Sequence, residues 1–204
     1  MKLIWHGHSC FSLHTTQGSL VIDPFAHHYV PGCGVVQATA DAVFCSHGHN
    51  DHGAKEVIPL TGAPCGIGVE TVPSWHDEVQ GAKRGPNLIH IFSAEGMKVA
   101  HLGDLGCELD EAQIAALRGC DMLLVPVGGF YTIDPAQAKA IVDQLAPRIV
   151  IPMHYRGNGF GFDVLATAED FLALCGSAVR LPTNELTVTA DTPAGIYVPA
   201  HPLH

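Results

Sequence analysis

Residues 46–53, "SHGHNDHG", constrain this chain most because they place three histidines and one aspartate within six residues. They directly follow the apolar run "ADAVFC", which favours a strand that ends in this loop. His47, His49, Asp51 and His52 offer imidazole nitrogens and a carboxylate, which suit Zn, with Fe and Mn as other possibilities. The segment therefore predicts a loop that wraps a metal ion. The alternative is a polar surface loop that is rich in histidine.

Length and charge narrow the class of protein. The chain has 204 residues, enough for one well-buried core but short for two, so we expect a single domain over residues 1–204. Its formal net charge of -10 disfavours nucleic acid and anionic membranes as partners. No window reaches the roughly 18 apolar residues of a membrane span, so we expect a soluble, cytoplasmic protein. Nothing in the sequence indicates the oligomeric state.

The hydrophobic pattern changes along the chain. Short segments rich in β-branched residues predict early strands at residues 2–5, 10–15, 19–23, 42–46, 87–92 and 97–104, with "SAEG" as a hairpin turn between the last two. Later residues predict helices at 109–120, 134–147 and 167–176, and buried strands at 121–127 and 148–153. Asp134, Pro135 and Thr167 are good N-terminal signals for two of these helices. This order suits sheets that pack together with helices outside.

Three further residues could join the histidine-rich loop in a metal site. His76, Asp104 and His154 each follow an apolar, strand-like run, and side chains at several strand ends can converge on one site. Taken singly, each of them also fits an ordinary role, as a turn aspartate or a packed histidine. Their combination with the loop 46–53 favours the metal site.

Five motifs, in this order along the chain, resemble the signature of the metallo-β-lactamase superfamily. They are "VIDPF" with Asp23, "SHGHNDHG", "VPSWHDE" with His76, "HLGDLG" with Asp104 and "VIPMHYRG" with His154. The segments "WHGHSCF", "PVGGFYTIDPAQA" and "IPMHY" are similar to the branch of metal-dependent hydrolases around ascorbate-6-phosphate lactonase. Two positions depart from the usual pattern, Ser46 in place of Thr and Leu105 in "GDLG", and neither is a ligand.

This resemblance implies a fold and a set of ligands. The fold is a four-layer αββα sandwich of the α/β (α+β) class. Two divalent metal ions would bind, with Zn first and Mn or Fe as alternatives, and Asp104 would bridge them. Asp23 would orient a metal-binding histidine and the ligand loop. The implied ligands are His47, His49 and His76 for one metal, and Asp51, His52 and His154 for the other.

A dinuclear site of this kind favours hydrolysis. Two metals roughly 3.5–4 Å apart can share a water, lower its pKa and polarise a carbonyl or phosphoryl oxygen. We therefore expect a metal-dependent hydrolase that uses a dinuclear metal-bound hydroxide to cleave an ester, lactone or phosphodiester bond of a small, anionic substrate. Asp51 would be the catalytic residue that orients the hydroxide or takes its proton. The alternatives are a metal-binding protein without turnover and a di-iron redox enzyme, which is disfavoured because such members carry a glutamate where this chain has His49.

The sequence offers three main candidates for substrate binding. His8 in "GHSC" resembles a histidine at the active-site edge of this branch, and a structural histidine is equally compatible. Arg156 lies two positions beyond His154, and an extended chain would direct both side chains to the same side. Its guanidinium could then clamp a carboxylate or phosphate. Tyr131 is a further candidate, as is the basic pair in "AKRG", although the sequence does not fix the direction of either segment. The identity of the substrate does not follow from the sequence.

Overall fold

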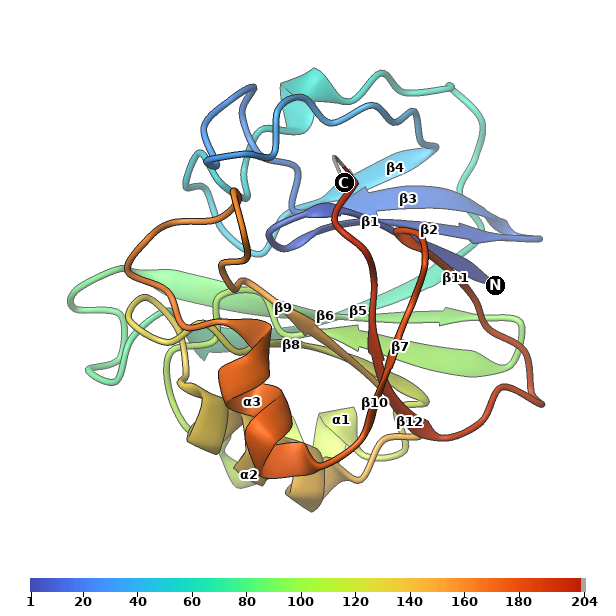
Figure 1. The fold of residues 1–204 in the computed structure, drawn as a ribbon. Coiled ribbons are helices and arrows are strands. Elements are labelled where there is room, and N and C mark those ends of the chain that lie inside the picture. Colours follow the sequence, from blue (N-terminus) through green and yellow to red (C-terminus); the bar gives the residue numbers. More distant parts are fainter. Residues whose placement is uncertain (203–204) are drawn as a thin grey trace.

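The computed structural model describes residues 1–202 and contains two β-sheets that pack against each other (Figure 1). The strands of the first sheet are β1 (Lys2–Gly7), β2 (Cys10–Thr15), β3 (Gly18–Ile22), β4 (Ala42–Phe44) and β11 (Glu185–Thr187). Those of the second are β5 (Gly68–Trp75), β6 (Pro86–Ala94), β7 (Met97–His101), β8 (Met122–Pro126), β9 (Ile149–Met153), β10 (Ala178–Arg180) and β12 (Gly195–Val198). The strand orders are β11-β1-β2-β3-β4 and β10-β12-β9-β8-β7-β6-β5.

The main hydrophobic core joins the two sheets. Leu3 and Phe11 from the first sheet belong to the same buried cluster as Ile91 and Val125 from the second. Burying each such side chain contributes about 1.5–3 kcal/mol. Every residue of β8 and β9 is buried, which is typical of parallel strands covered on both faces.

The helices cover the outer face of the second sheet (Figure 1). They are α1 (Glu111–Leu117), α2 (Pro135–Leu145) and α3 (Ala168–Cys175), as the sequence predicted to within a few residues. The carboxylate of Asp134 accepts the N–H of Gln137, and Pro135 occupies the first turn, so the N-terminal signal of α2 is confirmed. None of the helices within residues 1–202 is long and apolar enough to cross a membrane.

The outer face of the first sheet is covered differently. Apart from β4, which belongs to the sheet, the chain between β3 and β5 runs over this face mainly as loops with a short 3-10 helix, η1 (Lys55–Val57) (Figure 1). A second buried cluster, which includes Val21, Phe25 and Ile58, anchors these loops to the sheet. The segments on both sides of the loop that carries the predicted ligands are therefore packed against the sheet.

Four strands were not among the predicted ones. In β5, seven of the eight residues are exposed or half-buried, so the sequence showed a strand-like run only just before His76 and no apolar alternation over the whole strand. Pro73 is tolerated there because β5 lies at the edge of its sheet. The strands β10, β11 and β12 span only three or four residues each. The predicted hairpin is confirmed, with Glu95 and Gly96 both at positive φ between β6 and β7.

Strand direction decides where the ligands meet. The strands β7, β8 and β9 are parallel, so their carboxyl ends lie at one edge of the sheet. Two antiparallel pairings, β5 with β6 and β6 with β7, bring the end of β5 to the same edge. His76, Asp104 and His154 follow β5, β7 and β9, so this edge collects all three.

Candidate metal centre

The predicted ligands form two adjoining groups of side chains. His47, His49 and His76 make the first cluster, in which one ligand atom from each lies within 4.8 Å of the others. The second cluster, defined by the same criterion, consists of His8, Asp51, His52 and His154. A third grouping, of His47, His52 and Asp104, links the two clusters. The seven residues predicted from the sequence are therefore brought together, and His8 joins them.

Asp104 lies at the centre of this arrangement. Its Oδ2 is 3.2 Å from Nε2 of His76 and 3.3 Å from Nε2 of His154. Its Oδ1 is 3.1 Å from Nε2 of His52. One carboxylate thus contacts imidazoles of both clusters, as expected of a bridging ligand.

Buried polar atoms test whether these residues fit a metal. Within residues 1–202, several buried ring and carboxylate atoms of the two clusters and Asp104 have no hydrogen-bond partner. Leaving such an atom unsatisfied costs about 1–3 kcal/mol, and native proteins avoid it. Metal coordination would satisfy one nitrogen of each of these rings and the Asp104 oxygen, so the donor set fits a divalent ion that prefers nitrogen and oxygen. The atoms are Nδ1 and Nε2 of His8, Nε2 of His47, Nε2 of His52, Nδ1 of His76, Oδ1 of Asp104, and Nδ1 and Nε2 of His154.

Asp23 holds the ligand loop, residues 46–53, through buried hydrogen bonds. It is fully buried, with Oδ1 accepting the N–H of Ser46 at 2.6 Å and Oδ2 accepting the Ser46 hydroxyl at 2.6 Å. Its Oδ2 also lies 2.7 Å from Nδ1 of His52. Burial raises the pKa of Asp23, but His52 and Ser46 outweigh it and hold the pKa at about 2. The ionised carboxylate therefore keeps the His52 proton on Nδ1 and leaves Nε2 directed at the cluster.

We expect Asp23→Asn to weaken metal binding by about 10- to 100-fold, the usual effect of removing a group that orients a ligand. The amide would offer a donor where Ser46 and His52 already supply N–H and O–H groups. Competition with a chelating dye measures the affinity. Asp41→Asn is the matched control, because Asp41 accepts hydrogen bonds from Ser19 away from the clusters. Equal affinities for Asp23→Asn and the wild type would exclude this role.

The electrostatics of the clusters set the protonation of the imidazoles. Burial and the neighbouring His52 lower the pKa of His47 to about 3, and burial also lowers the pKa of His76. His52 is the exception: burial would lower its pKa, but the carboxylates of Asp104 and Asp23 raise it well above its ordinary value. In the metal-free protein His52 is therefore protonated at neutral pH. It must lose the proton on Nε2 to ligate a metal.

Because the raised pKa of His52 keeps its ring protonated, we expect zinc binding at neutral pH to release a proton from His52. Because the raised pKa keeps this proton bound, the apparent metal affinity should fall as the pH falls. Isothermal titration in two buffers of different ionisation enthalpy measures the number of protons released. Asp23→Asn removes one of the carboxylates that raise the pKa of His52, so it should release fewer protons. No proton release from the wild type would contradict the expectation.

His8 contributes more to the site than the sequence indicated. Its backbone is left-handed, with φ of 52°, and its carbonyl accepts the indole N–H of Trp5 at 3.0 Å. The buried ring is thereby turned inward, with Nε2 3.4 Å from Oδ2 of Asp51 and its centroid 4.1 Å from that of His154. The sequence left His8 open between the active-site edge and a structural role, and the left-handed turn that brings it into the second cluster has no local signal.

A polar residue that the sequence did not single out holds Asp104. The side-chain oxygen of Asn87 accepts the N–H of Asp104 at 2.9 Å, and its amide donates to Ser74 and to the carbonyl of Leu102. Gly103, at φ of 57°, lies so close that a Cβ would be 2.4 Å from Oδ1 of Asn87. The glycine before Asp104 is therefore required by both its conformation and its neighbours.

An open pocket of about 510 Å³, the metal pocket, lies over both clusters. Four of the predicted ligands line this pocket, namely His49, Asp51, His76 and Asp104. Tyr131 lines it as well, which places this residue where the substrate-binding prediction requires it. The other lining residues are Tyr29, Gly48, Asn50, Lys83, Arg84 and Phe162.

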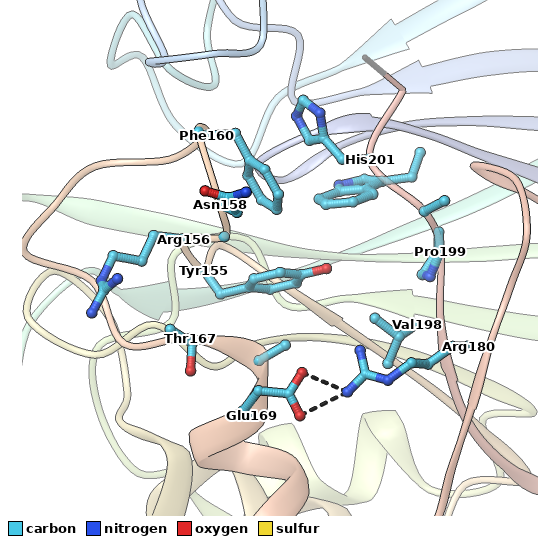
Figure 2. Close-up of a pocket in the computed structure, with 15 residues that line it drawn as sticks. Tyr155, Arg156, Asn158, Phe160, Thr167, Glu169, Arg180, Val198, Pro199 and His201 are labelled. Atoms are coloured by element: carbon cyan, nitrogen blue, oxygen red, sulfur yellow. Dashed lines mark hydrogen bonds and ion pairs between the residues drawn. The ribbon is translucent and has the colours of Figure 1, made fainter. Parts of the chain in front are cut away.

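The predicted placement of Arg156 beside the metal ligands is wrong. The chain is not extended at His154, whose φ of 53° is left-handed, so the alternation of an extended chain does not apply. The Nε of Arg156 donates to the carbonyl of Leu165 at 2.6 Å. Arg156 lines a separate pocket of about 660 Å³. Figure 2 shows its side chain pointing away from the rings of Tyr155 and Phe160.

Known proteins resemble this chain over most of its length. Residues 2–154 match the family described as "Beta-lactamase superfamily domain". A UPF0173 metal-dependent hydrolase from Thermoplasma acidophilum is 30% identical over 210 residues, which cover 87% of this chain and 92% of that protein. A structure from Thermotoga maritima, described as a Zn-dependent hydrolase of the metallo-beta-lactamase superfamily, has a TM-score of 0.78 and 33% identity and covers 97% of both chains. Igni18, a metallo hydrolase from Ignicoccus hospitalis, has the same fold at a TM-score of 0.64 and 21% identity, over 92% of this chain and 99% of its own.

The fold and the site together define an αββα protein whose histidine and aspartate side chains gather at one edge of two packed sheets. The chain belongs to the metallo-β-lactamase superfamily, and its relatives are named metal-dependent hydrolases. The predictions of the family, of the fold class and of a metal-dependent hydrolase are confirmed at this level. The narrower branch around ascorbate-6-phosphate lactonase stays a prediction.

Proposed function

We propose that this chain binds two divalent metal ions, with Zn preferred over Mn or Fe, and hydrolyses an ester, lactone or phosphodiester bond of a small anionic substrate. One observation carries the proposal: two clusters of buried ligand atoms adjoin each other and share the contacts of Asp104. A single tetrahedral ion uses about four ligands. The two clusters and Asp104 offer eight side chains, so two ions account for them better.

The metal pair would supply an activated water and polarise the oxygen of the scissile bond. Residues around the metal pair would orient the water and confine the substrate. Asp51 belongs to the second cluster and lines the metal pocket, so its carboxylate is placed to orient the attacking water. Tyr29, Tyr131 and Phe162 form aromatic walls that would confine a small substrate over the metals.

Elemental analysis of the folded, metal-reconstituted protein tests the metal count, with about two ions per chain expected. One ion or none would contradict the proposal. A panel of lactones, phosphodiesters and thioesters, with His47→Ala as the blank, then tests hydrolysis. Turnover by the wild type that is absent from His47→Ala supports the proposal. Bound iron together with reduction of O2 or NO would indicate the redox alternative, and bound metal without any turnover would indicate a binding protein.

A further inference from the structure

The loop after β5 is organised by one buried carboxylate. Asp77 Oδ1 accepts the backbone N–H groups of Val79 at 3.0 Å and Gly81 at 2.8 Å. Its Oδ2 accepts those of Lys83 at 3.0 Å and Arg84 at 2.7 Å. Asp77 is buried, so these four charge-assisted hydrogen bonds are shielded from water. A single side chain thus fixes the path of the segment that carries two cations to the metal pocket.

The same loop is fastened to the metal centre. The N–H of His76 donates to the carbonyl of Gly85 at 3.1 Å, which closes the loop next to a ligand of the first cluster. Gly106, from the loop that carries Asp104, packs so closely that a Cβ would be 2.4 Å from the carbonyl carbon of His76. The position of the cations is therefore set relative to both His76 and Asp104.

Arg84 crosses from this loop to the opposite wall of the pocket. Its guanidinium donates to the carbonyl of Phe130 at 3.1 Å and lies 5.6 Å from the ring centroid of Tyr131. Phe130 has a left-handed backbone with φ of 56°, which an ordinary residue adopts only when its surroundings require it. The hydrogen bond and the cation–π contact place the guanidinium at the pocket, beside Tyr131.

The two cations differ in their charge partners. Lys83 forms an ion pair with Glu78. The Arg84 guanidinium has no carboxylate partner within residues 1–202, since its contacts there are the Phe130 carbonyl and the Tyr131 ring. In a chain with a net charge of -10, an uncompensated guanidinium in the metal pocket is an unusual local charge. A planar guanidinium also matches the geometry of a carboxylate or phosphate.

We propose that Arg84 recognises an anionic group of the substrate, a carboxylate or a phosphate, in the metal pocket, and that Asp77 is the residue that positions it. The inference rests on the proposed function, because it assigns the specificity of the same site. It replaces Arg156 as the anion-binding residue. Lys83 contributes less to binding of the anionic group, since Glu78 already compensates its charge.

Direct binding of inorganic phosphate to the zinc-loaded protein tests the role of Arg84. We expect Arg84→Gln to weaken phosphate binding about 10- to 150-fold, the range of a charge-assisted hydrogen bond. The phosphate affinity of Arg84→Lys should lie between those of the wild type and Arg84→Gln, because lysine keeps the charge and loses the planar fork. Arg156→Gln is the matched control: it removes the same charge from the separate pocket and should change the affinity less than about twofold. Titrations with acetate show whether a carboxylate or a phosphate is preferred.

The variants separate failure of this inference from failure of the proposed function. If the wild type binds no metal, as elemental analysis of the same samples would show, the proposed function fails. If metal is bound but phosphate does not bind, or binds Arg84→Gln as tightly as the wild type, the inference about Arg84 is overturned. If Arg156→Gln weakens phosphate binding as much as Arg84→Gln does, the inference is also overturned. A long-range effect of charge would then explain both losses without a specific contact from Arg84.

A double-mutant cycle tests the positioning role of Asp77. Asp77→Asn lacks acceptors for two of the four N–H groups, so it should weaken phosphate binding in the wild-type background. In the Arg84→Gln background it should cause little further loss, because the residue that it positions is already absent. A merely structural role would give equal losses in both backgrounds and would overturn the assignment of Asp77. If Asp77→Asn does not fold, as melting curves would show, Arg84→Gln and Arg84→Lys still decide the anion site.

Discussion

Asp104→Asn should lower the metal content from about two ions per chain to about one or fewer, and turnover by about 10³-fold or more. The carboxylate contacts Nε2 atoms of His52, His76 and His154 at 3.1–3.3 Å, so its loss affects both clusters at once. A metal ion contributes several kcal/mol to transition-state stabilisation, and each 1.36 kcal/mol corresponds to about a factor of ten. The amide would also direct a donor at imidazole nitrogens that must act as ligands.

Elemental analysis and turnover of the same folded samples measure these effects. Asp121→Asn is the matched control, because Asp121 accepts the N–H of Lys98 beside the start of β7, at the opposite end of that strand from Asp104. It should lose some stability and keep its metals. Two ions per chain in folded Asp104→Asn would show that this carboxylate does not bridge the site.

The sequence predicted the parts of this molecule that have local signals. The capping residue Asp134 and the proline after it define the start of α2 without help from the rest of the fold. The loop 46–53 concentrates ligand types so strongly that the metal centre could be inferred before any tertiary contact was known. His76, Asp104 and His154 each follow a strand-like run, from which the sequence predicted that they converge on one site, and the strands before them do end at one edge of the sheet.

The parts that escaped prediction depend on backbone conformations and on hydrogen bonds to backbone groups. Arg156 was misplaced because a left-handed backbone at His154 breaks the alternation of an extended chain. His8 enters the second cluster through a similar left-handed turn, fixed by a hydrogen bond from Trp5. Asn87 and Asp77 act by accepting backbone N–H groups from residues whose positions only the folded chain defines. Residue types alone do not reveal such roles.

Asp51→Asn should lower kcat by about 10²-fold or more, with a smaller change in KM, because the group acts on the nucleophile more than on substrate binding. Asp51 is one of two carboxylates in the metal pocket, and its side chain is 16% exposed against 1% for Asp104. Asp51 is therefore the more accessible of the two carboxylates, while Asp104 is almost fully buried. Burial raises the pKa of Asp51, but His8 and His52 outweigh it and hold the pKa well below its ordinary value.

This low pKa favours one of the two roles open to Asp51. A weakly basic carboxylate is better suited to orient a water by accepting its hydrogen bond than to remove its proton. Asp51 should stay ionised as the pH falls from 8 to 5, so it should not cause an acidic limb in the pH profile of kcat over that range.

Metal content must be equal in Asp51→Asn and the wild type before their kcat values are compared. Asp163→Asn is the matched control, because Asp163 is exposed beside Phe162 at the metal pocket and loses the same charge. Its kcat should stay within about twofold of the wild type, since an exposed charge is largely screened. Near-wild-type turnover in fully metal-loaded Asp51→Asn would remove Asp51 from the mechanism and leave orientation of the water to the metals and to His8.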